Sequence, residues 1–371
     1  MLAHLRRTIA EADGWISFAD YMNAALYAPG LGYYAAGAHK FGIGGDFITA
    51  PESTPLFGAT LARQLAQVIA QAPDSESEII ELGPGSGRLC ADVLAALAKA
   101  RALPARYRLL EVSPELRERQ REHLAAAARE HLPRVEWIDM LPERWSGAVV
   151  ANEVLDALPA HLVVRRGGEW LERGVSIDAA GALAFDDRGL ASPGLRERAR
   201  TRFPATGDYL SELNPAAEAL VSSLAQRCER GLILLFDYGF PAAEYYHPQR
   251  NEGTLMAHHR HRAFADPFFR PGLVDLTAHV DFSAIARAGV ARGMTVAGFA
   301  TQAQFLVNCG VLDELALCGP PESTAYLRAA SAVQKLTSPA EMGELIKVLA
   351  LTRGIDAELV GFRDGDRSPR L

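Results

Sequence analysis

The chain has 371 residues, of which 49% are hydrophobic and 22% are charged. This length and composition allow one large core or two ordinary domains, and they exclude disordered and collagen-like chains. The 38 basic and 45 acidic side chains give a net charge of −7, which argues against a dedicated surface for nucleic acid or an anionic membrane. A cationic ligand or partner stays open. Four cysteines without a Cys-x-x-Cys pair exclude a disulfide framework and a zinc ribbon, and favour a reducing compartment.

Residues 1–72 are predicted to form an N-terminal cap or lid before the main core. The segment starts with a short amphipathic helix over residues 1–14 and continues with a stretch rich in glycine and aromatic residues, 27–47. A helix follows at about 55–72, with an apolar face that repeats at helical spacing.

The sequence favours a cytoplasmic protein over one of the mitochondrial matrix. The early acidic residues Glu11 and Asp13 argue against a transit peptide. The longest uncharged stretch, residues 294–312, contains polar residues and two glycines, so we expect buried globular structure there and no membrane span.

From residue 78 onward, short apolar runs alternate with helical periodicity, which predicts an α/β fold with a mostly parallel sheet and helices on both faces. The predicted core covers residues 73–160 and 231–371, with an insertion of antiparallel strands plus a helix at 161–230. Residues 240–280 carry many Pro, His, Arg and Gly, which predicts a long substrate-side loop. The predicted core strands are 78–82, 107–112, 135–138, 148–151, 232–236 and a final one near 346–352.

The sharpest local signal is the run Glu81-Leu82-Gly83-Pro84-Gly85-Ser86-Gly87, between the first core strand and a helix. Its glycines permit a tight turn and close approach of a ligand to the backbone beside the helix N-terminus. The spacing is G-x-G-x-G, with arginine at position 88, and this departure from the dinucleotide fingerprint disfavours a pyrophosphate ligand. A purely structural glycine turn is the alternative.

Two further strand ends offer groups for a nucleoside. Glu111 ends the second strand, where an acid in a nucleotide-binding sheet accepts hydrogen bonds from two ribose hydroxyls. Asp139 closes the third strand, where it would accept from the exocyclic amine of an adenine while Met140 packs against the ring. For Glu111 the alternative is a solvated carboxylate at a strand end.

Carboxylates also follow the fourth and fifth strands, in the runs 152–159 and 237–239. A guanidinium has a pKa above about 12, so a pair of carboxylates such as Glu153 and Asp156 would orient and polarise it for attack. Helix capping at a strand end is the alternative. No aromatic residue follows a double proline here, which disfavours the motif of many adenine and glutamine amino-methyltransferases.

Histidines cluster at His258, His259 and His261. A metal site is conceivable, but the cluster lacks the i, i+4 helical spacing of common zinc sites, so no metal is predicted. A substrate-facing loop in which histidine donates a hydrogen bond or acts as a base is favoured.

Many separate motifs of this chain, which follow one another in the same order, resemble those of the MidA family of class I methyltransferases. This family includes the mitochondrial complex I assembly methyltransferase. The resemblance implies binding of S-adenosyl-L-methionine, with the three turn glycines under its methionine part, Glu111 at the ribose and Asp139 near the adenine. It also implies that the loop 45–52 closes over the cofactor. The motifs are residues 21–22, 27–34, 45–52, 57–58, 81–87, 111–114, 151–159, 237–239, 250–255 and 275–282. The expected cofactor-binding residues are Asp46, Thr49, Pro51, Glu81, Gly83, Pro84, Gly85, Gly87, Glu111, Val112, Asp139, Met140 and Asn152.

For the mitochondrial relatives, the resemblance implies methylation of an arginine in a complex I subunit. For this chain we expect an S-adenosylmethionine-dependent protein arginine methyltransferase, whose acidic corners hold the cationic substrate and whose Tyr238 or His261 lines its path. The expected partner is a protein segment that contains arginine, either from a complex I subunit or, as in bacterial relatives, from a different protein. The expected catalytic residues are Glu153, Asp156, Asp237, Tyr238 and His261.

Two other functions compete with this interpretation. An assembly chaperone would keep the cofactor fold and perform little chemistry. A nicotinamide-dependent oxidoreductase is disfavoured by the G-x-G-x-G spacing. The lid and the 240–280 loop offer either a partner groove or a homodimer contact.

Overall fold

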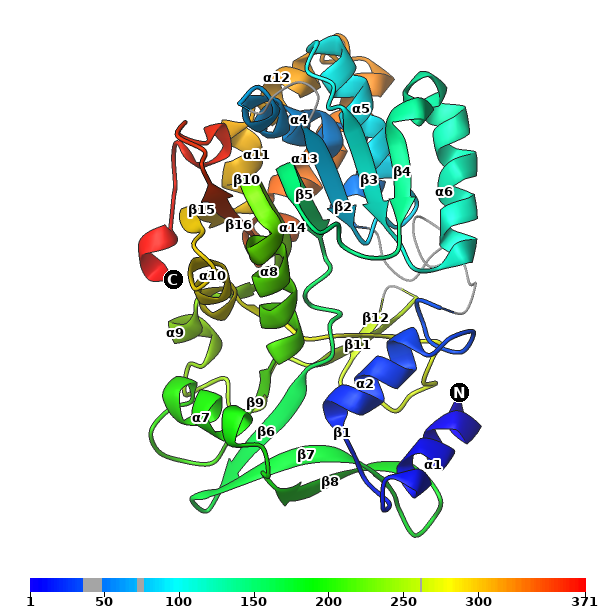
Figure 1. Ribbon diagram of the computed structural model, residues 1–371, viewed down its shortest axis with the longest axis vertical. Helices are drawn as coiled ribbons and strands as arrows, with labels where there is room; N and C mark the ends of the chain where they lie inside the picture. The colour runs from blue at the N-terminus through cyan, green and yellow to red at the C-terminus, as the bar shows by residue number, and fades with distance from the viewer. Residues whose placement is uncertain (36–48, 72–76, 261) are drawn as a thin grey trace. The chain divides into compact units, whose positions relative to one another are not determined.

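The computed structural model describes residues 1–35, 49–71, 77–260 and 262–371, in two compact units (Figure 1). The first unit contains residues 1–40, 155–219 and 240–284, and the second contains 41–154, 220–239 and 285–371. This division differs from the expected one. The helix expected at 55–72 belongs with the core sheet, and the stretch 240–280 belongs with the N-terminal segment.

The second unit is built on a sheet in which seven strands follow one another in the order β15-β16-β10-β5-β2-β3-β4. The strands β10, β5, β2, β3 and β4 are parallel, whereas β16 runs antiparallel to both β10 and β15. The predicted parallel sheet and its final strand are thus confirmed. These strands are β2 (Glu78–Leu82), β3 (Arg106–Leu110), β4 (Val135–Ile138), β5 (Trp145–Asn152), β10 (Cys228–Phe240), β15 (Thr295–Thr301) and β16 (Ile346–Arg353).

The sheet order places a switch point at β2. Its neighbours are β3 on one side and β5 on the other, and both lie later in the chain. All five residues of β2 are buried, as expected for a central strand covered on both faces. Ligands of open α/β sheets bind beyond the carboxyl end of such a strand, so the turn after β2 is where a site is expected.

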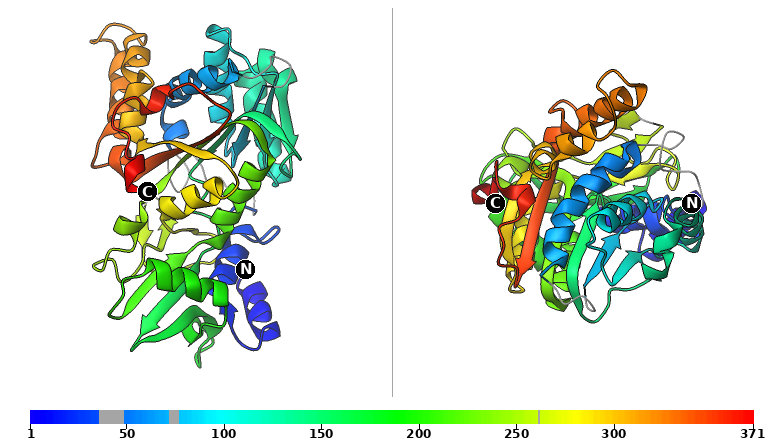
Figure 2. Two further views of the ribbon diagram at one scale, coloured as in Figure 1. Left: turned by 60° about the vertical axis from the view of Figure 1, so that its left-hand side comes forward. Right: turned by 90° about the horizontal axis from the view of Figure 1, so that it is seen from above.

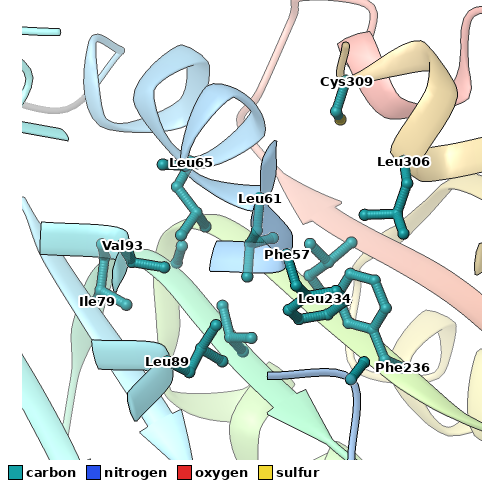
Figure 3. Packing of buried hydrophobic residues seen from close by; sticks show 14 of the residues in the cluster. Phe57, Leu61, Leu65, Ile79, Leu89, Val93, Leu234, Phe236, Leu306 and Cys309 are labelled. Carbon is teal, nitrogen blue, oxygen red and sulfur yellow. The ribbon is translucent and has the colours of Figure 1, made fainter. Parts of the chain in front are cut away.

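Helix α4 covers one face of this sheet and forms much of the core (Figure 3). Its Phe57, Leu61 and Leu65 face the sheet, where Phe57 meets Phe236 of β10 in an edge-to-face contact with ring centroids 5.4 Å apart. Helices α11 and α12 pack against α4, and α13 packs against both of them, as Figures 1 and 2 show. The helical segments of the second unit are α3 (Ala50–Ser53), α4 (Pro55–Ile69), α5 (Arg88–Lys99), α6 (Pro114–Ala127), α11 (Gln302–Asn308), α12 (Val311–Ala316), α13 (Thr324–Thr337), α14 (Met342–Leu345), η1 (Arg129–Arg134), η2 (Val360–Phe362) and η3 (Ser368–Arg370).

Two longer helices, α8 (Pro215–Arg227) and α10 (Phe282–Val290), pass from the first unit into the second. In the second unit, the indole of Trp145 donates to the Leu224 carbonyl of α8 at 2.9 Å. An added Cβ at Gly289 of α10 would lie 2.6 Å from Leu351 of β16. A larger residue at position 289 would therefore have to displace the end of the Leu351 side chain.

The first unit is built on an antiparallel sheet, in the order β1-β7-β6-β9 with β8 paired to β7. The expectation of antiparallel strands between residues 162 and 185 is confirmed. A second sheet, β12-β11-β13, lies within residues 240–280. The elements of this unit are α1 (Leu2–Glu11), α2 (Phe18–Tyr27), α7 (Pro193–Arg202), α9 (Ala242–Tyr245), β1 (Ile16–Ser17), β6 (His161–Arg166), β7 (Glu169–Ile177), β8 (Leu183–Gly189), β9 (Tyr209–Leu213), β11 (Met256–His259), β12 (Arg262–Phe264), β13 (Asp275–Thr277) and β14 (Val280–Asp281).

A buried carboxylate of the first unit holds one of its loops. Glu212, on β9, accepts hydrogen bonds from the backbone N–H groups of Thr254 at 2.7 Å and Leu255 at 2.9 Å. The hydroxyl of Tyr245 donates to the same carboxylate at 3.0 Å. An added Cβ at Gly253 would lie 2.3 Å from this carboxylate, so Glu212 and the glycine together fix the course of the loop.

Strand β15 is a part of the fold that the sequence did not reveal. It lies within the uncharged stretch that we expected to be buried globular structure, and four of its seven residues are buried. Its run Thr-Val-Ala-Gly-Phe-Ala-Thr mixes small and polar residues, so neither strict alternation nor a continuous apolar run marks it as a strand. In the part of the chain that the structure describes, no helix is long and apolar enough to cross a membrane.

Candidate cofactor and substrate site

The glycine turn follows β2 directly, as predicted, and all three of its glycines have left-handed backbone conformations. The φ angles are +59° at Gly83, +52° at Gly85 and +82° at Gly87. Gly87 is the N-cap of α5, and its N–H donates to the Pro84 carbonyl at 2.8 Å. Residues with a Cβ rarely adopt these angles, so the turn depends on glycine. The result is a short turn beside the N-terminus of a twelve-residue helix, a favourable place for a negatively charged ligand group.

Glu81 lies beneath this turn in the core of the second unit. The Tyr107 hydroxyl of the neighbouring strand donates to its Oε2 at 2.7 Å. Burial raises the pKa of Glu81 to about 8, because an ionised carboxylate is poorly solvated there. The bond to Tyr107 therefore holds this carboxyl group within the core, two residues before Gly83.

Glu111 follows β3, and its carboxylate is held in one orientation. The Ser113 N–H donates to Oε1 at 2.8 Å, and the Gln120 amide donates to Oε2 at 3.3 Å. Burial raises the pKa of Glu111, while the hydrogen bonds from Ser113 and Gln120 and the charge of Arg117 oppose that rise. A fixed carboxylate at this strand end fits the predicted ribose contact.

Gln120, on α6, is a site residue that the sequence analysis missed. Its side chain is 0% exposed, and Nε2 donates both to the Gly85 carbonyl at 2.9 Å and to Glu111. Its Oε1 accepts from the indole N–H of Trp137 at 2.9 Å. The available signal was its spacing of four residues from Leu124, the other buried residue of this polar helix, which placed both on the inner face.

The groups expected at the adenine lie exposed after β3 and β4. Val112 is 72% exposed and Met140 is 73% exposed. Asp139, next to Met140, is exposed as well. The exposed apolar side chains of Val112 and Met140 would provide apolar surface for a flat ring.

The segment that follows residue 48 is bonded to the glycine turn. Thr49 is the N-cap of α3, and Pro51 is buried in its first turn. The Ser86 hydroxyl donates to the carboxylate of Glu52, and the Arg88 guanidinium donates to the Glu52 carbonyl at 3.0 Å. Glu52 was not predicted as a site residue. The predicted Asp46 lies outside the described residues.

An acidic corner lies where β5 ends and its pairing with β10 stops. Glu153 has a left-handed φ of +52°, and its N–H donates to the Phe236 carbonyl at 2.9 Å. Asp237 is 1% exposed and accepts from the N–H groups of Val154 at 3.2 Å and Tyr238 at 2.9 Å. A strained backbone held by its surroundings is typical of functional sites. The structure therefore brings two of the predicted carboxylates together, Glu153 directly after β5 and Asp237 within β10 where its pairing with β5 stops.

Asn152 precedes Glu153 in the same corner. Its Nδ2 donates to the Glu153 carboxylate at 3.2 Å, which leaves its Oδ1 on the other side of the amide. This oxygen is buried and has no hydrogen-bond partner among the residues that the structure describes. A buried acceptor without a partner is costly, so Oδ1 is suited to accept from a bound ligand.

Asp156 lies in the first unit, in a second acidic cluster. Asp156 and Asp275 are both buried, and the Tyr34 hydroxyl donates to Asp275 at 3.1 Å. Tyr27 stacks on Tyr34 with ring centroids 5.5 Å apart. Burial and the two nearby aspartates raise the pKa values of both tyrosines well above their ordinary range.

The remaining predicted residues have more ordinary surroundings. The ring of Tyr238 packs against the hydrophobic core of the second unit. His258 lies 3.1 Å from the Thr277 hydroxyl, and burial lowers its pKa. His259 contacts Phe269. The predicted His261 lies outside the described residues.

The chain is similar to proteins of known family and structure. Residues 60–300 match the model of a family described as "Putative S-adenosyl-L-methionine-dependent methyltransferase". The chain is 32% identical to the mitochondrial protein arginine methyltransferase NDUFAF7 homolog of Drosophila melanogaster, over 95% of this chain and 85% of the relative. The homolog of Caenorhabditis elegans is 31% identical over 84% and 78%. A Burkholderia thailandensis protein solved with bound S-adenosyl-homocysteine is 50% identical, with a TM-score of 0.95 over 100% of this chain and 96% of that one.

Proposed function

Because the chain belongs to the MidA family of S-adenosylmethionine-dependent methyltransferases, we propose that it transfers a methyl group to an arginine side chain of a protein. The methyltransferase class and the cofactor come with the family. The arginine acceptor is the proposal, and it is supported by the relatives that are named protein arginine methyltransferases.

The second unit fits the cofactor. The three glycines of the turn over residues 83–87 carry no side chain, so a ligand could approach its backbone closely. Glu111 would take the ribose hydroxyls, while Val112, Asp139 and Met140 would contact the adenine. The buried Oδ1 of Asn152 would accept from the ammonium of the methionine part.

The observation that carries the arginine acceptor is the acidic corner at Glu153 and Asp237. When bound, S-adenosylmethionine supplies an electrophilic methyl group. A guanidinium is cationic and planar, so carboxylates at neighbouring strand ends would hold it and orient one nitrogen. Such positioning is worth about 7–11 kcal/mol of barrier in well-oriented reactions. The main-chain bonds that hold Glu153 in its left-handed conformation keep this orientation fixed.

For Asp156, which belongs to the first unit, we propose a contact with a cationic group. Its carboxyl group lies near Asp275 and two buried tyrosines, and such a cluster is complementary to a cation. A helix-capping role for Asp156 would leave substrate turnover unchanged.

The experiment that tests this function looks for transfer of a labelled methyl group from S-adenosylmethionine to a protein. The purified protein is incubated with methyl-labelled S-adenosylmethionine and the proteome of a strain that lacks the gene. Acid hydrolysis of the labelled protein should release methylarginine. Label on another residue would overturn the arginine acceptor. Tight cofactor binding without any label would favour the assembly chaperone instead.

Variants of the acidic groups test the substrate-holding role in single-turnover methylation of the labelled acceptor. Glu153→Gln and Asp156→Asn should each slow the reaction by about 10-fold or more, the usual effect of losing a charged contact. Glu143→Gln removes an exposed carboxylate of the second unit and serves as the control. The proposed role is wrong if both site variants react at the wild-type rate.

A further inference from the structure

Gln120 occupies an unusual place for an uncharged polar side chain. It is fully buried on α6, whose only other buried residue is Leu124. A buried amide is costly unless its donors and its acceptor are all used. In this chain they are used, because Nε2 donates to Gly85 and Glu111 and Oε1 accepts from Trp137.

These three bonds join the ends of three parallel strands. Gly85 lies in the turn after β2, Glu111 follows β3, and Trp137 belongs to β4. The indole N–H of Trp137 can only donate, so it fixes which end of the amide is the oxygen. Nε2 must then face the glycine turn and the Glu111 carboxylate.

We infer that Gln120 is a positioning residue that sets the orientation of Glu111 and thereby the discrimination of the cofactor's ribose. This inference rests on the ribose contact of Glu111 proposed above. On the protein side the carboxylate accepts from the backbone N–H groups of Val112 and Ser113, the latter at 2.8 Å from Oε1, and from Gln120 Nε2 at 3.3 Å from Oε2. Gln120 is the side-chain donor of this set, and without it Oε2 is held less firmly in the orientation that would meet both ribose hydroxyls.

The effect on ribose recognition is separable from a general effect on the fold. Loss of the bond to Gly85 would weaken every ligand that uses the turn. Loss of the bond to Glu111 would weaken only ligands that carry both hydroxyls. The ratio of two dissociation constants, for S-adenosylhomocysteine and for its 2′-deoxy analogue, therefore reports the Glu111 contact alone.

The test measures both constants by calorimetry for the wild type and for Gln120→Met, which keeps the length of the side chain without its polar atoms. We expect the wild type to prefer S-adenosylhomocysteine by about 10-fold or more, since the hydroxyl donates to a charged acceptor. In Gln120→Met we expect this preference to fall to about 2-fold, the size of a weak neutral contact.

The chain offers a matched control in Gln64 of α4, another fully buried glutamine of the second unit. Its Nε2 donates to Gln67 at 2.9 Å, and its Oε1 accepts from the Gly361 N–H at 3.0 Å. Gln64→Met should lower the thermal stability and leave the ribose preference at the wild-type value. Equal loss of preference in both variants would mean a structural role only, and would overturn the inference.

Glu111→Gln separates failure of this inference from failure of the proposed ribose site. If Glu111→Gln retains the wild-type preference, the ribose is not at Glu111 and both ideas fail. If Glu111→Gln loses the preference and Gln120→Met keeps it, only the positioning role fails. If Gln120→Met does not fold, Trp137→Phe serves in its place, because it removes the donor that fixes the Gln120 amide. We expect this variant to reduce the preference for S-adenosylhomocysteine by about 3-fold. An unchanged preference would again count against the positioning role of Gln120.

Discussion

Two buried glutamates, one in each unit, accept backbone hydrogen bonds and yet serve different purposes. Glu212 in the first unit accepts from two backbone N–H groups and three hydroxyls, which belong to Ser211, Tyr245, Thr254 and Leu255. Glu111 in the second unit has donors at Ser113 and Gln120, both from the helical segment that follows it. Glu212 has a loop wrapped around it, whereas Glu111 stands at the carboxyl end of a parallel strand beside a glycine turn. Burial and hydrogen bonding are common to both glutamates, so they do not by themselves indicate a ligand site. The position at the carboxyl end of a parallel strand is what indicates one.

The largest effect should come from removing the carboxylate of Glu212, which holds a loop of the first unit. Glu212→Ala leaves the N–H groups of Thr254 and Leu255 and the hydroxyl of Tyr245 without their acceptor. Each unsatisfied buried group costs about 1–3 kcal/mol, so we expect a loss of about 3–5 kcal/mol in the free energy of unfolding. Urea unfolding followed by circular dichroism measures it.

The control for that loss is Glu169→Ala, which removes an exposed carboxylate from β7 and should change stability by less than about 0.5 kcal/mol. Folded Glu212→Ala protein should bind S-adenosylhomocysteine with the wild-type affinity. A large loss of affinity with little loss of stability would reverse the roles assigned to the two glutamates.

Breaking the glycine turn should remove the ligand function and spare the fold. Gly85 has a φ of +52°, where a β-branched residue is strained, so Gly85→Val should distort the turn and weaken S-adenosylhomocysteine binding by about 100-fold or more. Calorimetry checks the affinity and circular dichroism checks the fold. Gly207→Val is the control, because Gly207 has a φ of +86° and nothing within 4 Å of an added Cβ. Cofactor binding that survives in Gly85→Val would place the cofactor elsewhere.

The acidic corner should affect turnover more than cofactor affinity. In Asp237→Asn, one of the two N–H groups at Val154 and Tyr238 faces an amide NH2 in place of an acceptor. The corner around Glu153 should loosen, and we expect kcat to fall by about 10- to 30-fold while the Kd of S-adenosylhomocysteine changes less than about 3-fold. Equal kcat values for variant and wild type would exclude Asp237 from the substrate site.

The sequence predicted those features of the second unit that depend on neighbours along the chain. Runs of apolar residues marked β2 and β4 with their observed bounds, and the glycine run marked the turn between β2 and α5. Ser113 precedes Pro114, a pattern typical of a helix start, and its hydroxyl accepts from the Leu116 N–H of α6.

The missed features depend on contacts between residues that are distant in sequence. Gln120 draws its role from Gly85 and Trp137, 35 and 17 residues away, and nothing in its own segment shows those partners. The three- and four-residue strands β11 to β13 are too short to show an alternating pattern. Local pattern thus predicted the elements, while tertiary pairing decided which polar side chains the site uses.

The smallest effect should appear as a change in pH dependence at Glu81, beneath the turn. Burial raises its pKa from an ordinary value of 4.5 to about 8, so the folded chain keeps a proton that the unfolded chain releases between these values. The stability that this proton provides is complete below about pH 4.5 and is lost as the pH rises through about 8.

Glu81→Gln resembles the protonated form, and its side chain still accepts from Tyr107. The fall in Tm between pH 5 and pH 8.5 should therefore be about 2–4 °C smaller in the variant than in the wild type. Burial also raises the pKa of Asp92 to about 6. Because Asp92 is unchanged in the variant, the part of the fall in Tm that comes from Asp92 should remain. Differential scanning calorimetry at several pH values measures it, with the exposed Glu118→Gln as control. Identical slopes of Tm against pH for Glu81→Gln and the wild type would mean that Glu81 is ionised in the folded chain, which would contradict the raised pKa.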